Sequence, residues 1–332
     1  MTRSVETRTE LLLQAARQAR LAPSVHNTQP WRFVLADGAL EIYSDPRRQL
    51  AVLDSTGRQL LISCGCAVFN ARVALAAQGY DAVVERFPDG FHPTLVARIA
   101  LGDQPGTIPP IGLLDGCIIS RQTNRRRFTD EVVSPELTAQ LLEAASAEQA
   151  ILVELDDLQH RLAVARLSQE ADRLQNADPA YRAELRTWTT DDPTRPDGVP
   201  AITVPRVTGE SQDDIPIRDF DTRGTGSLPP ETRSHLGQSL FALGTAGDDP
   251  VSWLRAGEAL EHLWLEITRQ GYVASLFTQA IEIPYLRQQL RIELGLTMNP
   301  HVLVRVGKAG VTSASMRRRL QDIVVDRTTA HG

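Results

Sequence analysis

The sequence is poor in the features that secreted and membrane proteins need. It has only three cysteines among 332 residues, Cys64, Cys66 and Cys117, and this small odd number excludes a disulfide framework. The first 30 residues hold no basic start followed by an apolar run, and no later apolar stretch approaches the roughly 20 residues that cross a bilayer. We therefore expect a soluble, cytoplasmic protein in which Cys64 and Cys66 pack in the core.

The common catalytic motifs are also missing. The sequence has no H-E-x-x-H, no G-x-x-x-x-G-K-[ST] and no G-x-S-x-G. Glu258 and His262 share one face of an expected helix, but an exposed ion pair or a contact at the edge of the core is favoured over a pair of metal ligands. The formal charge of −6 argues against nucleic acid or an anionic membrane as a partner, and the 5% of aromatic residues also argues against nucleic acid. Any anion site must therefore be local.

The chain does contain one series of elements that occurs twice in the same order: helix, strand, long helix and strand. Both long helices end in Gln-Gly-Tyr, and their glycines, Gly79 and Gly271, stand 192 positions apart and suit a left-handed helix stop. Four matches in one order indicate an internal duplication. The matched segments are Leu12–Ala16 with Leu141–Ala145, Trp31–Leu35 with Ile151–Leu155, residues 56–78 with 250–270, and Pro93–Ile99 with Pro300–Val306.

The duplication divides the chain into a first half, residues 1–112, and a second half, residues 113–332. The second half gains an insertion at about 178–249, whose Pro-, Gly- and Asp-rich sequence is typical of loops and is too long for an ordinary connection. We interpret this insertion as either a lid or a disordered excursion. As a lid, it is expected to cover the site that the second half holds.

The two halves keep different polar elements. The first half keeps a loop, Pro23–Trp31, whereas only the second half keeps the cationic segments Arg121–Arg125 and Arg317–Arg319. If the halves pack as the two subunits of a homodimer do, one complete site forms and its symmetry mate is empty. The expected molecule is a monomer that acts as an intramolecular dimer.

The arginines of the second half are suited to a phosphate. Arg121 and Arg125 are spaced by one helical turn with Thr123 between them, and Arg317 and Arg319 can approach from the C-terminal segment. Guanidinium groups and a hydroxyl make charge-assisted hydrogen bonds to phosphate oxygens. The alternative is that both basic runs are solvated faces.

The loop of the first half is rigid and polar. Asn27 and Gln29 offer amide donors and acceptors, and Pro23 and Pro30 stiffen the chain around them, so the loop can read the edge of a flat heterocycle. The alternative is a capped turn before a strand. We expect His26 to be structural, because a single histidine in a loop seldom carries catalysis alone.

Together these elements resemble the nitroreductase superfamily of FMN-dependent oxidoreductases. Pro23–Trp31 is similar to the family's Pro-Ser-x-x-Asn-x-Gln-Pro-Trp loop, which in the family's homodimers reaches the flavin held mainly by the other subunit. Residues 121–125 resemble its Arg-x-Ser-x-Arg element, and residues 317–319 its final basic pair. The resemblance implies a cofactor contact for Pro23, Ser24, Val25, Asn27, Gln29, Arg121, Thr123, Arg125, Arg317 and Arg319.

Residues 274–280 fall where the family places backbone amides near the flavin N5, which makes Thr278 and Gln279 the candidates there, although the family's usual Pro and Gly are absent. The doubled length, the loop wording and the Leu-Arg-x-Gly-Glu stretch Leu254–Glu258 resemble the Acg-like branch, which consists of two fused nitroreductase halves. The implied fold is α+β, a tandem nitroreductase-like pseudo-dimer with two sandwiched sheets and helices between them.

The resemblance implies FMN as the cofactor and no metal. NAD(P)H would pass a hydride to FMN N5 and leave, and a nitroaromatic or quinone would then take the electrons in a ping-pong cycle. Because the flavin carries this chemistry, no catalytic protein residue is required. The alternative is a protein that sequesters or stores FMN under the lid with little turnover. The sequence does not separate NADH from NADPH or name the acceptor.

Overall fold

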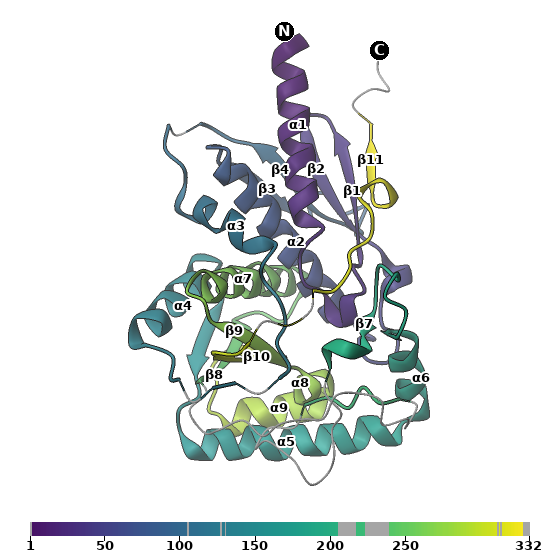
Figure 1. The fold of residues 1–332 in the computed structure, drawn as a ribbon, viewed down its shortest axis with the longest axis vertical. Coiled ribbons are helices and arrows are strands. Elements are labelled where there is room, and N and C mark those ends of the chain that lie inside the picture. The colour runs from purple at the N-terminus through teal and green to yellow at the C-terminus, as the bar shows by residue number, and fades with distance from the viewer. Residues whose placement is uncertain are drawn as a thin grey trace.

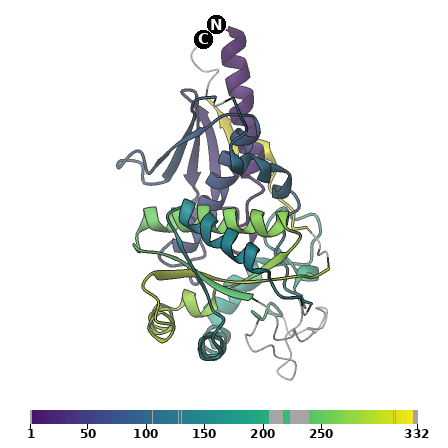
Figure 2. The ribbon, with the colours of Figure 1, turned by 90° about the vertical axis from the view of Figure 1, so that its left-hand side faces the viewer.

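The computed structural model describes residues 2–104, 106–126, 128–129, 131–204, 217–222, 239–310, 312 and 314–327, with side chains from residue 8 onward. The fold is α+β, as expected, and is layered (Figures 1 and 2). Figure 2 shows a first sheet, a layer of helices, a second sheet crossing below them, and two further helices seen end-on at the outer face. The helices between the sheets bury apolar side chains on both sides, which is the ordinary solution for amphipathic elements.

The strands form two larger sheets and one short pair. The first sheet has the order β11-β1-β2-β4-β3, and the second has the order β5-β8-β10-β9. The first sheet contains β1 (Trp31–Ala36), β2 (Ala39–Ser44), β3 (Ala82–Arg86), β4 (Leu95–Leu101) and β11 (Val324–Asp326); the second contains β5 (Ile151–Glu154), β8 (Ser239–Thr245), β9 (Val273–Phe277) and β10 (Asn299–Gly307); β6 (Thr189–Thr190) pairs with β7 (Val199–Pro200). Apart from β11, the two larger sheets have matching orders.

The helices differ in length and place (Figure 1). α2 and α7 lie at the centre, while α5, α8 and α9 pack on the outer face of the second sheet around a separate apolar cluster. The helices are α1 (Thr2–Ala19), α2 (Arg58–Ala77), α3 (Asp115–Ile118), α4 (Pro135–Ala147), α5 (Leu158–Ala177), α6 (Pro179–Thr187), α7 (Pro250–Arg269), α8 (Gln279–Glu282) and α9 (Pro284–Glu293).

The two central helices meet at a pair of glycines. A Cβ atom on Gly65 would lie 2.0 Å from the carbonyl oxygen of Leu254, and one on Gly257 would lie 2.0 Å from that of Ile62. Only glycine allows two backbones to approach so closely. The contact is therefore reciprocal, and it fixes where α2 crosses α7.

Two sequence expectations need correction. The stretch 178–249 is not all loop, because it includes α6 and also β8, a central strand of the second sheet that pairs with both β5 and β10. α2 is long and apolar enough, by length and composition alone, to cross a membrane, which the sequence analysis overlooked. Its side chains are largely buried against α1 and α7, so α2 is a core helix.

A buried ionic cluster joins α2, α7, α4 and β3. Glu258 is fully buried and accepts hydrogen bonds from Arg72 at 2.8 Å and from Arg86 at 2.6 Å, and Arg72 also reaches Glu148 at 2.5 Å. His262 contacts Glu148, with 3.2 Å between Nδ1 and Oε1. The expected exposed pair of Glu258 and His262 is wrong, because both residues are buried and each has other partners.

Candidate functional site

The loop between α1 and β1 is held in an unusual conformation. His26, Asn27 and Gln29 have positive φ angles of 45°, 55° and 48°, in the left-handed region that residues other than glycine seldom occupy. The Ser24 hydroxyl accepts a hydrogen bond from the backbone N–H of Gln29 at 2.9 Å, and the side-chain amide of Asn27 donates to the Gly198 carbonyl at 3.0 Å. The loop is therefore preformed by contacts with itself and with the second half.

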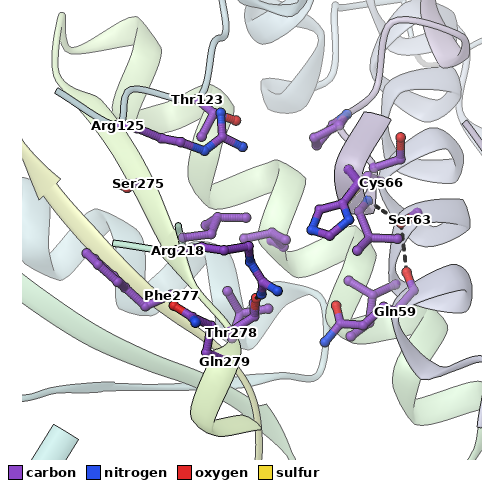
Figure 3. A pocket seen from close by; sticks show the side chains of 18 of the residues that line it. Gln59, Ser63, Cys66, Thr123, Arg125, Arg218, Ser275, Phe277, Thr278 and Gln279 are labelled. Atoms are coloured by element: carbon purple, nitrogen blue, oxygen red, sulfur yellow. Dashed lines mark hydrogen bonds between the residues drawn. The ribbon is translucent and has the colours of Figure 1, made fainter. Parts of the chain in front are cut away.

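A cavity with two lobes lies between this loop, α2 and the second half. Both lobes are lined by Pro23, Ser24, Thr123 and Arg125, so they meet at these residues. The first lobe is cationic; it is also lined by Asn27, Arg121, Gln122, Ser315 and Arg317. The second lobe has mostly apolar walls; its lining includes Val25, His26, Gln59, Ile62, Ser63, Cys66, Arg218, Phe220, Leu260, Trp264, Phe277, Thr278 and Gln279 (Figure 3).

The segment that carries the first arginines is extended, so the expected spacing of one helical turn is wrong. Thr123 forms a parallel bridge with Ala274, and the Asn124 amide donates to the Ala274 carbonyl at 2.9 Å. In an extended chain alternate side chains point the same way. Arg121, Thr123 and Arg125 consequently all line the first lobe, whereas the Asn124 side chain turns away and donates to the Gly310 carbonyl.

Positive charges crowd the first lobe. Arg121 and Arg317 both donate to the Leu21 carbonyl at 3.3 Å, and the Arg121 Nε lies 3.2 Å from the fully buried Glu261 carboxylate. Burial, and then the neighbouring Arg121 charge, lower the pKa of Arg317 to about 9. Burial together with Arg218 lowers the pKa of Arg125 to about 10. Such cations are poorly stabilised by the protein alone.

Arg125 and Glu261 show how incomplete the neutralisation is. Arg125 lies over the Phe220 ring at 5.4 Å and makes no ion pair with any carboxylate that the structure describes. Burial raises the pKa of Glu261 to about 7 against the opposing effect of Arg121. The three guanidinium groups of this lobe therefore have one neighbouring carboxylate, which pairs with Arg121 and is only partly charged near neutral pH. An anion in this lobe would stabilise all three.

Gln29 and Arg319 lie outside the cavity lining. Gln29 is fully buried, donates to the Pro196 carbonyl at 2.8 Å and accepts from the Arg318 amide at 2.8 Å. It therefore fastens the segment around residue 196 and the C-terminal segment to the loop. Arg319 is exposed, while Arg318 donates to the Gln29 carbonyl at 3.3 Å. The sequence motif identifies Gln29, but its role depends on contacts that only the folded chain reveals.

Thr278 and Gln279 line the second lobe, where the resemblance places the flavin N5. The Thr278 hydroxyl donates to Glu282 at 2.7 Å, and the Gln279 amide donates to Asp172 at 2.9 Å. His26 also lines this lobe, and burial holds the pKa of its imidazole well below the ordinary value.

The sequence analysis missed two groups of lining residues. Gln59, Ser63 and Cys66 face the second lobe from α2, opposite Thr278 and Gln279 (Figure 3). Gln59 and Ser63, two polar residues one turn apart in an apolar helix, were the available signal. Residues 217–222 contribute Ile217, Arg218 and Phe220 from the middle of the insertion, where the sequence offers no motif.

The chain belongs to the nitroreductase family. The protein named "Putative NAD(P)H nitroreductase acg" from Mycobacterium tuberculosis is 31% identical over 329 residues, covering 97% of this chain and 98% of the relative. A second Mycobacterium tuberculosis protein with the same class of name is 33% identical over 310 residues, covering 91% of this chain and 88% of the relative. A comparison with models of protein families found no match.

Solved structures are more distant. A nitroreductase with bound FMN from Bacteroides fragilis matches with a TM-score of 0.37 and 11% identity, covering 65% of this chain and 96% of that one. Nitroreductase A from Vibrio parahaemolyticus matches with a TM-score of 0.39 and 11% identity, covering 65% of this chain and 76% of that one.

Proposed function

We propose that this chain binds one FMN in the two-lobed cavity and acts as an NAD(P)H-dependent oxidoreductase of the nitroreductase type. The observation that carries the proposal is the junction of a cationic lobe with an apolar one. In the cationic lobe, Arg121, Arg125 and Arg317 carry three positive charges against one carboxylate, Glu261. The remaining excess suits a phosphate dianion, and the apolar lobe next to it suits a flat ring.

The lining residues fit the cofactor in a second way. Several buried polar atoms have no hydrogen-bond partner in the part of the chain that the structure describes, among them Arg317 Nε, His26 Nδ1 and Gln59 Nε2. Buried polar groups without partners are costly, so a polar ligand that bonded to these three lining atoms would be favoured. Arg121, Thr123, Arg125 and Arg317 would hold the phosphate, while Pro23, Ser24 and Val25 would face the ring.

A bound flavin would supply the chemistry, accepting a hydride from NAD(P)H and reducing a nitroaromatic or quinone acceptor. The protein's own part is to hold the ring between α2 and β9 and to limit water around it. Thr278 and Gln279, with side chains already fixed by Glu282 and Asp172, remain the proposed neighbours of the reactive edge.

Storage of FMN is the alternative, and one observation favours it. The Arg218 guanidinium is held by the Glu282 carboxylate at 2.5 Å and by the Tyr181 hydroxyl, so residues 217–222 are anchored beside the cavity. We propose that this segment acts as a lid over the flavin. A lid that stays closed would retain the cofactor and hinder an acceptor, giving a protein with little turnover.

We also propose that the chain is a fused pseudo-dimer with halves at 1–112 and 113–332. The matching strand orders, and the reciprocal contact of Gly65 with Gly257, which are 192 positions apart like Gly79 and Gly271, support this proposal. Such a contact is typical of a two-fold axis. A monomer is then the expected state, because the partner half is already present.

The ionic cluster explains why the pseudo-dimer would have one site. The offset of 192 relates three lining residues of the cavity to three members of the cluster. Trp264 and Thr278 correspond to Arg72 and Arg86, and Cys66 corresponds to Glu258. Arg72 and Arg86 each form an ion pair with Glu258. We infer that the mate of the cavity is filled by this cluster rather than left empty.

An absorbance spectrum tests the proposed function. The purified protein, or the apoprotein after incubation with FMN, is expected to show flavin bands at one FMN per chain. Under anaerobic conditions, bleaching of these bands by NADH or NADPH supports the enzyme, and persistence with both supports storage. A protein that takes up no FMN contradicts the proposal.

Replacing Phe220 by alanine tests the lid. The centroid of the Phe220 ring lies 5.8 Å from that of the His26 ring, and the Arg125 guanidinium lies over the Phe220 ring. Removing the Phe220 ring therefore opens one wall of the cavity. We expect FMN to dissociate about tenfold faster, which corresponds to roughly 1.4 kcal/mol. Stopped-flow measurement of FMN release gives the rate, with Phe91→Ala, an exposed phenylalanine, as the control. An unchanged rate contradicts the lid.

A further inference from the structure

The amides that the sequence motif offers for reading a heterocycle are already occupied. Asn27 donates to the Gly198 carbonyl and accepts from Arg317 at 3.1 Å, and Gln29 is held by Pro196 and Arg318. In the second lobe, Gln279 is likewise bonded to Asp172. Gln59 differs, because its Nε2 is buried and has no partner among the described residues.

Gln59 is also firmly placed. It stands in the first turn of α2, where the Asp54 carboxylate accepts hydrogen bonds from the backbone N–H groups of Gln59 at 3.0 Å and of Leu60 at 2.9 Å. One turn later, the Ser63 hydroxyl donates to the Gln59 carbonyl at 2.7 Å. The side chain is only 6% exposed and faces the second lobe from the wall opposite Thr278 (Figure 3).

The chemistry of this position indicates what it would bind. A primary amide presents a donor and an acceptor side by side, and it matches an edge that alternates carbonyl oxygens with an N–H group. Leaving a buried amide unbonded is unfavourable, whereas a ligand that completes it gains affinity and orientation. The pyrimidine edge of a flavin has this alternating pattern.

We propose that Gln59 positions the ring by hydrogen bonding to the pyrimidine edge of FMN. The inference rests on the proposed function and adds a residue from the first half to it. In the proposed function, arginines of the second half bind the phosphate. Gln59 would add a contact from the first half, on the other side of the cavity. With the two ends of the cofactor fixed from different halves, the ring has one orientation between α2 and β9.

The test combines two variants with two ligands. Gln59→Met keeps the length of the side chain and removes both hydrogen-bonding groups; Gln78→Met makes the same change at an exposed position at the end of α2. FMN and its N3-methyl analogue are titrated by fluorescence against each apoprotein, after thermal melting has shown that it is folded. N3 methylation removes the N–H group at the edge that Gln59 would read.

The expected result is a Kd for FMN that rises about 5- to 100-fold in Gln59→Met. The penalty of N3 methylation should shrink in this variant and stay at its wild-type value in Gln78→Met. If Gln59→Met does not fold, Gln59→Glu, which keeps the shape and loses the amide donor, is expected to give the same pattern. A wild-type affinity, or an unreduced methylation penalty, in the Gln59 variant overturns the inference alone; wild-type protein that binds no FMN overturns the proposed function with it.

Discussion

Replacing both Arg121 and Arg317 by alanine is expected to abolish FMN binding while the protein stays folded. The two side chains share the Leu21 carbonyl and line the cationic lobe, so their loss leaves Arg125 as the one guanidinium of the three that line it. A hydrogen bond to a charged group contributes about 1.5–3 kcal/mol, and two of them correspond to roughly a 10²- to 10⁴-fold change in Kd.

The protein should survive this double substitution because of the state of Glu261. Its pKa is already raised to about 7 by burial, with Arg121 acting in the opposite direction. Without Arg121 the carboxyl group would take up a proton rather than remain as an unpaired buried charge. The variant should therefore fold best below neutral pH, where the carboxyl group is neutral.

Titration with FMN and with riboflavin measures the effect. Riboflavin has no phosphate, so its affinity should change little between the wild type and the double variant. Arg126→Ala serves as a matched control, because Arg126 belongs to the same basic run but is exposed and bonds to the Ile202 carbonyl. Equal loss of FMN and riboflavin would point to general damage, and equal FMN occupancy in all proteins would refute the phosphate assignment.

Alanine at Gly65 is expected to unfold the protein or to cost more than about 4 kcal/mol of stability, a value that single substitutions seldom reach. The new Cβ would lie 2.0 Å from the backbone oxygen of Leu254, which is no flexible side chain and cannot move aside. The long helices α2 and α7 would have to separate along their whole contact. Gly257→Ala should have a similar effect, because its Cβ meets the Ile62 carbonyl at the same distance.

Urea denaturation of the two variants measures this cost. Gly116→Ala is the matched control, since Gly116 lies in a short helix and a Cβ there meets nothing within 4 Å. It should change stability by less than about 1 kcal/mol in either direction. Wild-type stability of Gly65→Ala would mean that α2 and α7 do not cross at this point.

Much of the architecture could be predicted from local signals. The Gln-Gly-Tyr endings marked the ends of α2 and α7, and both glycines adopt the left-handed conformation there, with φ of 79° and 69°. Ser134 before Pro135 is a local signal of the same kind, and its hydroxyl accepts a hydrogen bond from the Leu137 backbone N–H at the start of α4. Such signals depend only on residues that are adjacent in the sequence, so they can be recognised before the fold is known.

The features that sequence could not provide depend on distant contacts. β8 follows a long stretch rich in Pro and Gly, and its place between β5 and β10 is set by pairing rather than by its own sequence. Gln29 fits a family motif, yet its amide is directed by Pro196, 167 residues away. Gln59 belongs to no motif, and the proposal for it depends on a buried Nε2 that has no partner among the residues that the structure describes.

The last strand has a consequence for how the molecule holds together. β11 leaves the second half and pairs in parallel with β1 at the edge of the first sheet, from Phe33 opposite Val324 to Leu35 opposite Asp326. The segment before it carries Arg317 to the cavity. The tail therefore ties the wall that carries Arg317 to the first sheet: were β11 to separate from β1, Arg317 would lose this support, and residues 1–112 or 113–332 expressed alone would lack part of the cavity lining.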